Sequence, residues 1–297
     1  MAKPKILVIV GSTASGKTGL AIELAKRFNG EVISADSRQV YRGLDIGTAK
    51  VTEEEMEGIP HHLINVANPM EGYSAANFKN DARTSINDIA SRGKLPIVAG
   101  GTFFYVDTLL GRVSLPEVEP NQALRHSLEE KSTVELFTTL KEKDPERAKK
   151  IDPKNKRRLV RALEIIHQLE YVPKISEKRS DFAFLIIGIE AEKEDLRNKF
   201  AERAKSWLKG GFLQEVQNLL DEGITRERLT EIGFEYRLGL ELLDKEITEE
   251  EFIQKFIEKN WQYAKRQITW LKRDKEIQWF KAAEDNVFKA VEDFIKT

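Results

Sequence analysis

Residues 6–18 have the sequence ILVIVGSTASGKT, in which an apolar run leads into a glycine-rich loop. Helix-forming residues follow at 19–25, so the order predicts a β-strand, a loop and a helix. The loop fits the P-loop pattern G-x-x-x-x-G-K-[ST] in full. In a P-loop, successive backbone N–H groups and the positive end of the helix converge on a phosphate. A helix start with incidental glycines is the alternative, and the strand–loop–helix order favours the P-loop.

The P-loop pattern assigns roles to particular residues of the loop. Gly11 and Gly16 permit a turn that a side chain would block. Lys17 is expected to place its ammonium group on the terminal phosphate, and Thr18 to place its hydroxyl on a bound Mg²⁺. The pattern predicts that a di- or triphosphate binds here, but it leaves the reaction open. The whole predicted segment comprises Gly11, Ser12, Thr13, Ala14, Ser15, Gly16, Lys17 and Thr18.

The composition of the 297 residues is that of a soluble, helix-rich globular protein, with 40% hydrophobic and 33% charged residues. No apolar run approaches the roughly 18 residues needed to span a membrane. Only five apolar residues separate the basic N-terminus from Gly11, which is too short for a signal peptide. The chain contains no cysteine, so disulfides and thiolate metal sites are excluded. We expect a cytoplasmic protein with no membrane partner.

Charged residues are balanced overall but segregated along the chain. With 48 Lys and Arg against 49 Asp and Glu, the net charge of −1 does not indicate a polyanionic partner. Basic residues nevertheless concentrate between Lys141 and Arg161, and again between Lys265 and Lys275. Local basic stripes, rather than net charge, bind nucleic acid. From charge alone, a solvated helix face is an equally open alternative.

Segments typical of strands and of helices alternate along the chain. Apolar runs predict strands at 31–35, 95–99, 182–189 and 277–280, and helices are expected at 74–91 and 103–110. This alternation predicts an α/β fold, a P-loop NTPase-like parallel sheet flanked by helices. Residues 113–181 show helical periodicity and no strand. We therefore expect an inserted all-helical domain at 113–181 within an α/β core formed by 1–112 and 182–297.

The predicted sheet brings three polar features together at one edge. Ligands of such sheets bind at the carboxyl ends of the strands, which places the P-loop, Asp36 and Thr102 on one rim. The third strand ends in Gly100-Gly101-Thr102, without the metal-binding acid of P-loop hydrolases. The acid instead follows the second strand, as Asp36, which favours transfer to a bound acceptor over hydrolysis. Asp36 capping its own turn is the alternative.

Beyond the P-loop, the chain carries an ordered set of motifs from end to end. They are DSRQVY at 36–41, GLDIGTAK at 43–50, PHHL at 60–63, YSAA at 73–76, GGT at 100–102 with Tyr105, RLVRALE at 158–164 and YAKRQITW at 263–270. With this set the chain resembles the tRNA dimethylallyltransferases, also called tRNA isopentenyltransferases. The cysteine-containing zinc finger of eukaryotic members is absent, which indicates the bacterial type.

The resemblance implies transfer of a dimethylallyl group from dimethylallyl diphosphate to N6 of the adenosine just 3′ of the anticodon, within the tRNA anticodon stem-loop. Diphosphate would leave while the P-loop, Lys17 and Mg²⁺ on Thr18 stabilise its charge. Asp36 is expected to act as the general base on N6–H. Thr13 is expected to contact the diphosphate or the reacting centre. The base must be flipped out of its stack to reach the site.

The resemblance also implies which residues bind the two substrates. Lys265 and Arg266 are expected to bind the diphosphate. Contacts at 157–161 would make the basic insertion a surface for RNA phosphates. The enzyme is expected to act as a monomer. The residues expected to contact tRNA are Asp36, Ser37, Arg38, Gln39, Thr102, Arg125, Arg157, Arg158, Leu159, Val160, Arg161 and Arg237.

Two positions depart from the family pattern. The usual Ile-Gly-Tyr is Ile-Gly-Phe here, which leaves open whether Phe234 or Tyr236 takes the aromatic position and makes Arg237 a weaker candidate ligand. Trp261 stands where many members carry Arg. If that Arg binds diphosphate in the family, Lys265 and Arg266 must suffice here.

Two other functions compete with prenyl transfer. A small-molecule kinase of the shikimate- or nucleotide-kinase kind shares the P-loop and an acid after the second strand, and it is the runner-up. A non-catalytic RNA-binding ATPase lacks support because no acidic strand end is present. His61 and His62 are expected to be structural or RNA-facing, since zinc sites need more ligands. The tryptophans are expected in the core; they are Trp207, Trp261, Trp270 and Trp279.

Overall fold

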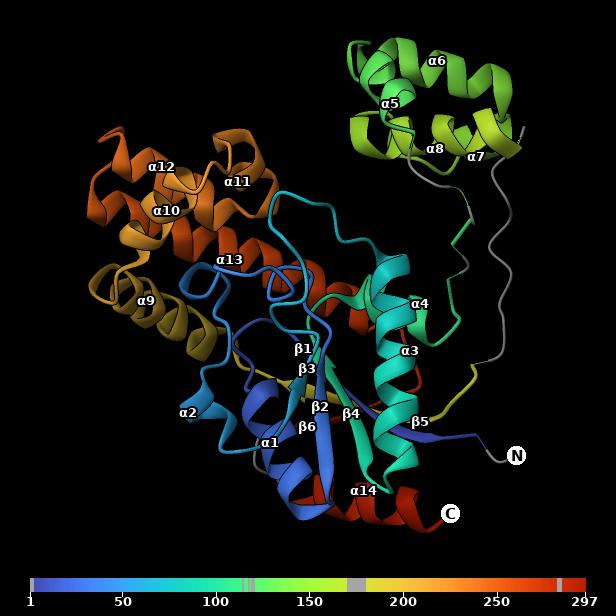
Figure 1. Cartoon of the computed structure of the whole chain (residues 1–297), viewed down its shortest axis with the longest axis vertical. Coiled ribbons are helices and arrows are strands. Elements are labelled where there is room, and N and C mark those ends of the chain that lie inside the picture. Colours follow the sequence, from blue (N-terminus) through green and yellow to red (C-terminus); the bar gives the residue numbers. More distant parts are fainter. Residues whose placement is uncertain (1–2, 114, 117, 119–120, 170–179, 282–284) are drawn as a thin grey trace. The chain divides into compact units, whose positions relative to one another are not determined.

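The structure is a computed structural model that describes residues 3–113, 115–116, 118, 121–169, 180–281 and 285–297 (Figure 1). The chain divides into two compact units. The first unit comprises Met1–Gly111 with Arg179–Thr297, and the second comprises Arg112–Lys178. Among the described residues, no helix is both long enough and apolar enough to cross a membrane.

The first unit is built on a parallel sheet whose strands, within the described residues, have the order β3-β2-β4-β1-β5-β6. The central strand β1 lies between β4 and β5, with Val8 opposite Val98 on one side and Ile186 on the other. The predicted α/β fold is confirmed. β3 was not predicted, because two residues are too few to give a strand pattern. The strands are β1 (Lys5–Gly11), β2 (Gly30–Ser34), β3 (His61–His62), β4 (Leu95–Gly100), β5 (Ala183–Glu190) and β6 (Ile277–Lys281).

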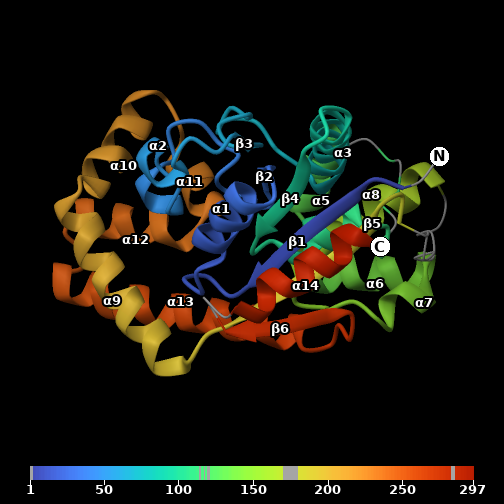
Figure 2. The ribbon, with the colours of Figure 1, turned by 90° about the horizontal axis from the view of Figure 1, so that it is seen from below.

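Helices cover both faces of the sheet, because β1 is apolar and buried on both of its faces. Successive side chains of a strand point to opposite faces. Ile6 and Val8 share a core cluster with α3 (Ala75–Ser91) and α4 (Phe103–Leu109). Leu7 and Ile9 share another cluster with α1 (Lys17–Arg27) and α14 (Asp285–Lys296). Figure 2 shows α1 and α14 beside β1.

The predicted start of α3 is confirmed by a capping box at Ser74. The Ser74 hydroxyl accepts a hydrogen bond from the Asn77 N–H, and the Asn77 side chain accepts one from the Ser74 N–H. These two bonds satisfy N–H groups that a helix end otherwise leaves without partners. The helix ends at Ser91, before Gly93 with its φ of 69°.

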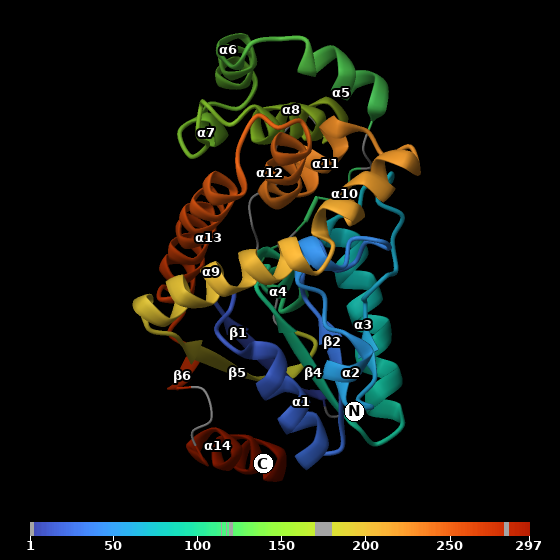
Figure 3. The same cartoon turned by 90° about the vertical axis from the view of Figure 1, so that its left-hand side faces the viewer.

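A group of helices packs on the loop that follows β2. Val40 and Leu44 of this loop are buried with Phe212, Tyr236 and Phe256 in one cluster. Figure 3 shows α9 alongside α13, and these two helices are in extensive contact. The loop also carries the short helices η1 (Ile46–Thr48) and α2 (Glu53–Met56). The helices of the group are α9 (Lys193–Lys209), α10 (Phe212–Asp221), α11 (Arg226–Ile232), α12 (Phe234–Leu243) and α13 (Glu249–Leu271).

The second unit has a hydrophobic core of its own. Among its described residues, the regular elements are α5 (Gln122–Glu129), α6 (Thr133–Lys143), α7 (Pro145–Ala148) and α8 (Lys156–Leu169). Leu136 and Leu140 of α6 pack against Leu159 and Leu163 of α8. Spacings of four residues place each pair on one side of its helix, so both helices bury one stripe.

Candidate active site

The P-loop adopts the turn that its glycines permit. Gly16 has a φ of 94°, in the left-handed region, and is the N-cap of α1. A Cβ atom on Gly11 would lie 2.6 Å from the Ser15 Oγ. No side chain caps the N-terminus of α1. The first N–H groups of the helix are therefore open to an anion such as a phosphate.

The Lys17 side chain folds back over the loop. Its Nζ donates a hydrogen bond to the Ser12 carbonyl oxygen at 2.6 Å. Burial lowers the pKa of Lys17 to about 8; the charge of Asp36 acts to raise it and that of Arg203 to lower it. A bound phosphate would favour the charged lysine, because an opposite charge nearby raises the pKa of an amine.

Asp36 caps its own turn with one carboxylate oxygen. Its Oδ1 accepts hydrogen bonds from the N–H groups of Arg38, at 2.9 Å, and of Gln39, at 3.4 Å. The structural alternative for Asp36 is thus present in the molecule. The hydrogen bonds of the turn use only one carboxylate oxygen, however, since no described residue hydrogen-bonds Oδ2. One oxygen orients the carboxylate and the other can receive a proton.

The P-loop, Asp36 and Thr102 lie at the carboxyl ends of neighbouring strands. β1 precedes the P-loop, β2 precedes Asp36 and β4 precedes Thr102. The Thr102 Oγ1 accepts a hydrogen bond from the Ser37 N–H at 3.0 Å. A Cβ atom on Gly100 would lie 2.2 Å from the Ala35 carbonyl oxygen, so glycine lets the two strand ends meet. The structure brings these sequence-predicted features to one edge.

Gln267 of α13, which the sequence did not single out, joins the two sides of this edge. Its Oε1 accepts a hydrogen bond from the Thr13 N–H at 2.8 Å, and its Nε2 donates one to the Gly101 carbonyl at 3.0 Å. The side chain is almost fully buried. The sequence feature that could have identified Gln267 is its position on the buried stripe of a helix, three residues after Ala264, where a polar residue is unusual.

Arg203 of α9 is a second residue that the sequence did not single out. Its Nη1 lies 3.4 Å from the Thr13 Oγ1. Among the described residues it has no carboxylate within ion-pair distance. Burial lowers its pKa, and the charges of Glu235 and Glu55 oppose that shift. A partly buried guanidinium without an anionic partner, next to a phosphate loop, is suited to bind a phosphate oxygen.

The residues present fit a magnesium ion whose ligands come mainly from the phosphate oxygens of a bound substrate. Thr18 is exposed at the first turn of α1, and no described residue hydrogen-bonds its hydroxyl. The described residues contain no group of three His, Cys, Asp or Glu that could hold a metal. Mg²⁺ commonly binds with few protein ligands plus phosphate oxygens and water. Thr18 would be its protein ligand here.

The family model described as IPP transferase matches residues 39–274. The chain belongs to this family. The tRNA dimethylallyltransferase of Anoxybacillus flavithermus is 40% identical over 291 residues, which cover 96% of this chain and 93% of that relative. The full-length tRNA isopentenylpyrophosphate transferase of Bacillus halodurans has a TM-score of 0.72 at 37% identity, covering 99% and 96% of the two chains. A eukaryotic dimethylallyltransferase acting on tRNA has a TM-score of 0.85 at 31% identity, covering 98% and 79%.

In this member of the IPP transferase family, Arg38 lies between two aromatic rings. Its Cζ is 5.7 Å from the ring centre of Phe234 and 5.6 Å from that of Tyr263. Its Nη1 donates to the Glu235 Oε2 at 2.6 Å. Burial works against the charge of Arg38, but Glu235, Tyr263 and Asp36 together outweigh it and raise the Arg38 pKa. Arg38 is therefore a fixed cation beside the Asp36 turn.

The two candidates for the family aromatic position have different surroundings. Phe234 faces Arg38. Tyr236 is fully buried, and its hydroxyl donates to the Glu215 Oε1 at 2.9 Å. Phe234 is thus the aromatic residue next to the predicted site, whereas Tyr236 belongs to the core.

Two side chains that the resemblance assigned to tRNA make contacts within the first unit. Gln39 accepts a hydrogen bond from the Ser34 hydroxyl at 3.2 Å and donates one to the Ala49 carbonyl at 3.1 Å. Its amide is engaged internally, so the structure gives Gln39 a role in holding the turn. Arg237 is partly exposed, with its Nε 3.5 Å from the Glu241 Oε1.

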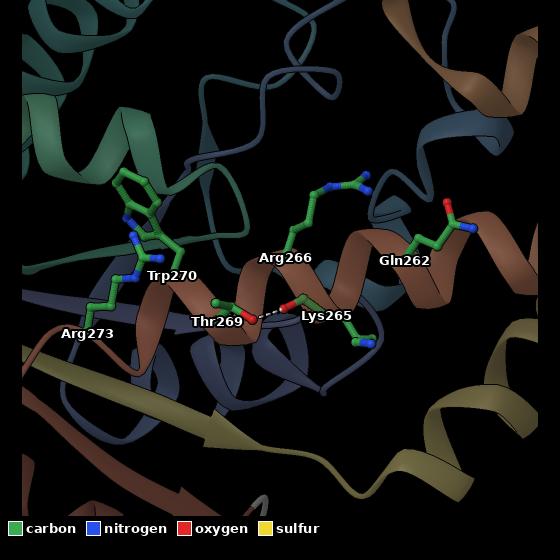
Figure 4. A pocket seen from close by; sticks show the side chains of 6 residues that line it. All are labelled: Gln262, Lys265, Arg266, Thr269, Trp270 and Arg273. Atoms are coloured by element: carbon green, nitrogen blue, oxygen red, sulfur yellow. Dashed lines mark hydrogen bonds between the residues drawn. The ribbon is translucent and has the colours of Figure 1, made fainter. Parts of the chain in front are cut away.

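One face of α13 forms a basic groove of about 590 Å³ (Figure 4). Lys265 and Arg266 leave the helix in different directions, so they present charge to two sides of it. The Arg266 guanidinium lies 5.8 Å from the ring centre of Tyr263. Positive charge and the exposed ring of Trp270 suit a nucleic-acid strand. The groove is lined by Gln262, Lys265, Arg266, Thr269, Trp270 and Arg273.

The expectation that Trp270 lies in the core is wrong. Trp270 is 47% exposed, because it lines the groove on α13 and is not part of a core cluster. Its Nε1 donates to the Asp107 Oδ2 at 3.2 Å. The other tryptophans pack against core clusters as predicted; they are Trp207, Trp261 and Trp279.

Arginines of the second unit surround a buried carboxylate. Glu164 is fully buried, and its Oε2 accepts a hydrogen bond from the Arg125 Nη2 at 2.8 Å. The Arg161 Nη1 lies 3.6 Å from the same oxygen, and its Nη2 donates to the Val118 carbonyl at 2.9 Å. Glu164 thereby holds two of the predicted tRNA-binding arginines in place.

The segment 157–161 divides between surface and core. Arg157 and Arg158 are exposed. Leu159 and Val160 are buried in the core of the second unit, so their side chains face away from any RNA. The side chains of these two residues have a packing role, because α8 is amphipathic and turns its apolar stripe inward, and the contact of the segment 157–161 with tRNA stays a prediction.

His61 and His62 make structural contacts, as expected. The His61 Nδ1 lies 2.9 Å from the Ile59 carbonyl. The His62 Nε2 lies 2.8 Å from the buried Glu31, which also pairs with Arg92. The contact of His62 with Glu31 joins β3 to β2, whereas that of His61 is local to its own segment.

Proposed function

We propose that this protein transfers a dimethylallyl group from dimethylallyl diphosphate to N6 of the adenosine just 3′ of the anticodon in tRNA. The bond between C1 and the diphosphate oxygen breaks, the bond between N6 and C1 forms, and N6 loses a proton. The observation that carries the proposal is a P-loop facing a carboxylate across neighbouring strand ends, in a chain of the IPP transferase family.

The phosphate side of the site is suited to a leaving diphosphate. Open N–H groups at the start of α1 can donate hydrogen bonds to its oxygens, and Lys17 and Arg203 can bring positive charge from two sides. Negative charge grows on the diphosphate as the C1–O bond breaks, so cations placed beforehand stabilise the transition state more than the substrate. Mg²⁺ bound at Thr18 would add Lewis-acid stabilisation of the same charge.

The acceptor side supplies a base in a fixed orientation. Adenine N6 is a weak nucleophile because its lone pair is delocalised into the ring, and loss of its proton makes it stronger. The Asp36 Oδ2 can accept that proton while Oδ1 remains bound to the turn. The adenosine must leave its stack to reach the site, which favours an unpaired loop as the substrate region.

A direct assay tests this function. The purified protein is incubated with Mg²⁺, unmodified tRNA and dimethylallyl diphosphate labelled in its dimethylallyl group, and in parallel with ATP labelled in its γ-phosphate and small hydroxyl acceptors. We expect the label in the RNA. After nuclease digestion it should be found on N6 of one adenosine, the one just 3′ of the anticodon. Label transfer from ATP to a small acceptor, with none to RNA, would instead establish the kinase.

Reversing the charge of Arg158 is expected to weaken RNA binding about tenfold or more, because the exposed side chain on α8 is proposed to neutralise a phosphate. Binding of the Arg158→Glu variant to an anticodon stem-loop, measured across salt concentrations, should show a salt slope reduced by about 1. Lys209→Glu, an exposed change at the end of α9 and outside the basic stretch 141–161, is the matched control. Equal slopes for the Arg158 variant and the unaltered protein would contradict an RNA surface at this position.

A further inference from the structure

A carboxylate of α10 holds the loop that follows β2. The Glu215 Oε2 accepts hydrogen bonds from the N–H groups of Asp45, at 2.9 Å, and Ile46, at 2.6 Å. Its Oε1 accepts from the Gly47 N–H and from the Tyr236 hydroxyl, both at 2.9 Å. All four partners are donors. The site therefore requires a group that only accepts, and a carboxylate meets this requirement while an amide does not.

The loop is pressed closely against the helices at the same place. A Cβ atom on Gly47 would lie 2.6 Å from the Tyr236 Cζ and 2.8 Å from the Phe212 Cε2. Glycine is therefore required there for a spatial reason, and both aromatic side chains are fully buried. Close packing against α10 and α12 restricts where the backbone at 45–47 can lie, and Glu215 accepts its hydrogen bonds in that position.

The far end of this loop holds the Asp36 turn. The Gln39 Nε2 donates to the carbonyls of Thr48, at 3.5 Å, and Ala49, at 3.1 Å. The Gln39 Oε1 accepts from the Ser34 hydroxyl at the end of β2, and the Gln39 N–H donates to the Asp36 Oδ1. One side chain thus ties the carbonyls of the loop to the turn that orients the carboxylate.

We propose that Glu215 is a positioning residue for the transfer reaction, acting on Asp36 through the loop 45–49 and Gln39. The inference rests on the proposed role of Asp36 as the base. If Glu215 no longer binds the loop, the carbonyls that hold Gln39 lose their fixed place, and the Asp36 carboxylate keeps only its hydrogen bond from the Arg38 N–H. A displacement of about 1 Å at a reacting group can lower a rate about 100-fold. The P-loop is hydrogen-bonded instead to Gln267, Arg203 and Lys199, which are not members of this relay, so diphosphate binding is not part of it.

The first test is Glu215→Gln. This variant keeps the shape of the side chain but replaces one acceptor oxygen by an NH₂ group, which then faces the hydrogen-bond donors that Glu215 accepts. We expect kcat for transfer to fall about 10- to 100-fold, with KM for dimethylallyl diphosphate and Kd for inorganic diphosphate changed less than twofold. The matched control is Glu251→Gln, which removes a carboxylate that accepts the Thr248 N–H at the start of α13. It should change the melting temperature at most, and leave kcat unaltered.

A second variant breaks the relay at its other end. Gln39→Met keeps Glu215 and its loop intact, so it remains informative if Glu215→Gln does not fold. We expect a similar loss of kcat, and we expect the double variant to lose no more than the larger single loss. In Glu215→Gln, hydrogen exchange at the amides of Arg38 and Gln39 should accelerate together with that at 45–47.

The outcomes separate this inference from the proposed function. An unaltered kcat in a folded Glu215→Gln variant, or fully multiplicative losses in the double variant, would overturn the relay while leaving the transfer reaction in place. Absence of transfer by the unaltered protein would refute the function instead. The hydrogen-exchange measurement needs no turnover, and independent exchange at 38–39 and 45–47 would by itself overturn the relay.

Discussion

Replacing Asp36 by Asn is expected to lower kcat for dimethylallyl transfer by about 10²- to 10⁴-fold, the range that a general base contributes. The amide keeps an oxygen that can accept the N–H groups of Arg38 and Gln39, so the turn should persist. It lacks a basic oxygen for the proton of N6. Single-turnover transfer to an anticodon stem-loop measures the loss, and calorimetry with inorganic diphosphate should give a Kd within about threefold of the unaltered protein.

Asp36→Ala separates the two functions of this carboxylate. It removes the turn acceptor as well as the base, so it should lower thermal stability while Asp36→Asn should not. A buried or partly buried hydrogen bond of this kind contributes about 1 kcal/mol. Near-normal turnover of the Asn variant would show that Asp36 serves only the turn, and the base would have to be sought elsewhere.

Replacing Lys17 by Met is expected to lower transfer about 10²- to 10³-fold, as loss of a preorganised charge-stabilising donor does. Diphosphate affinity should fall as well, because Lys17 is the cation within the P-loop itself. The same variant should be more stable than the unaltered protein in the absence of ligand. Activity and stability would thus move in opposite directions, which loss of folding cannot produce.

The gain in stability has a defined pH dependence. The pKa of Lys17 is about 8 in the fold, against 10.5 for an ordinary lysine, with burial as the main cause. Between these values the unfolded chain binds more protons, so Lys17 makes the fold more stable as pH rises through this window. The destabilisation is fully present about one pH unit below 8, and its relief by Lys17→Met should be about 3 kcal/mol at pH 7 and nearly absent at pH 10.5.

Urea unfolding at these two pH values measures the effect. The matched control is Lys209→Met, which replaces an exposed lysine at the end of α9. Equal stability of the Lys17 variant and the unaltered protein at pH 7 would show that the ammonium group is well solvated in the fold. Diphosphate binding by the unaltered protein should weaken as pH rises above 8, because the free lysine loses the charge that the ligand requires.

Interactions between neighbouring residues were predictable from the sequence. The P-loop turn depends on Gly11 and Gly16, the start of α3 depends on Ser74, and the strands follow from apolar runs. Each of these features depends on residues a few positions apart, so each can be recognised from the order of residues in the sequence. The common location of the P-loop, Asp36 and Thr102 on one rim was also predictable, because parallel strands place their carboxyl ends at one edge.

Other features of the site depend on which helix face turns inward. Leu159 and Val160 lie within a basic stretch, yet they are buried. Trp270 lies within a family motif of mixed polarity, yet it is exposed. Motif membership does not distinguish a side chain that contacts a ligand from its neighbour that supports the helix. That distinction comes from the packing of the helix.

By itself the sequence determined the phosphate loop, the parallel sheet and the carboxylate at its rim, because each arises from local backbone geometry or from strand order. Only the tertiary structure assigned Gln267 to Thr13, across 254 positions, and Glu235 to Arg38, across 197. It likewise assigned Glu215 to the loop at 45–47. The physical reason is that a buried polar group takes whichever partner the packing brings within about 3 Å. Nothing in the spacing of residues along the chain specifies that distance.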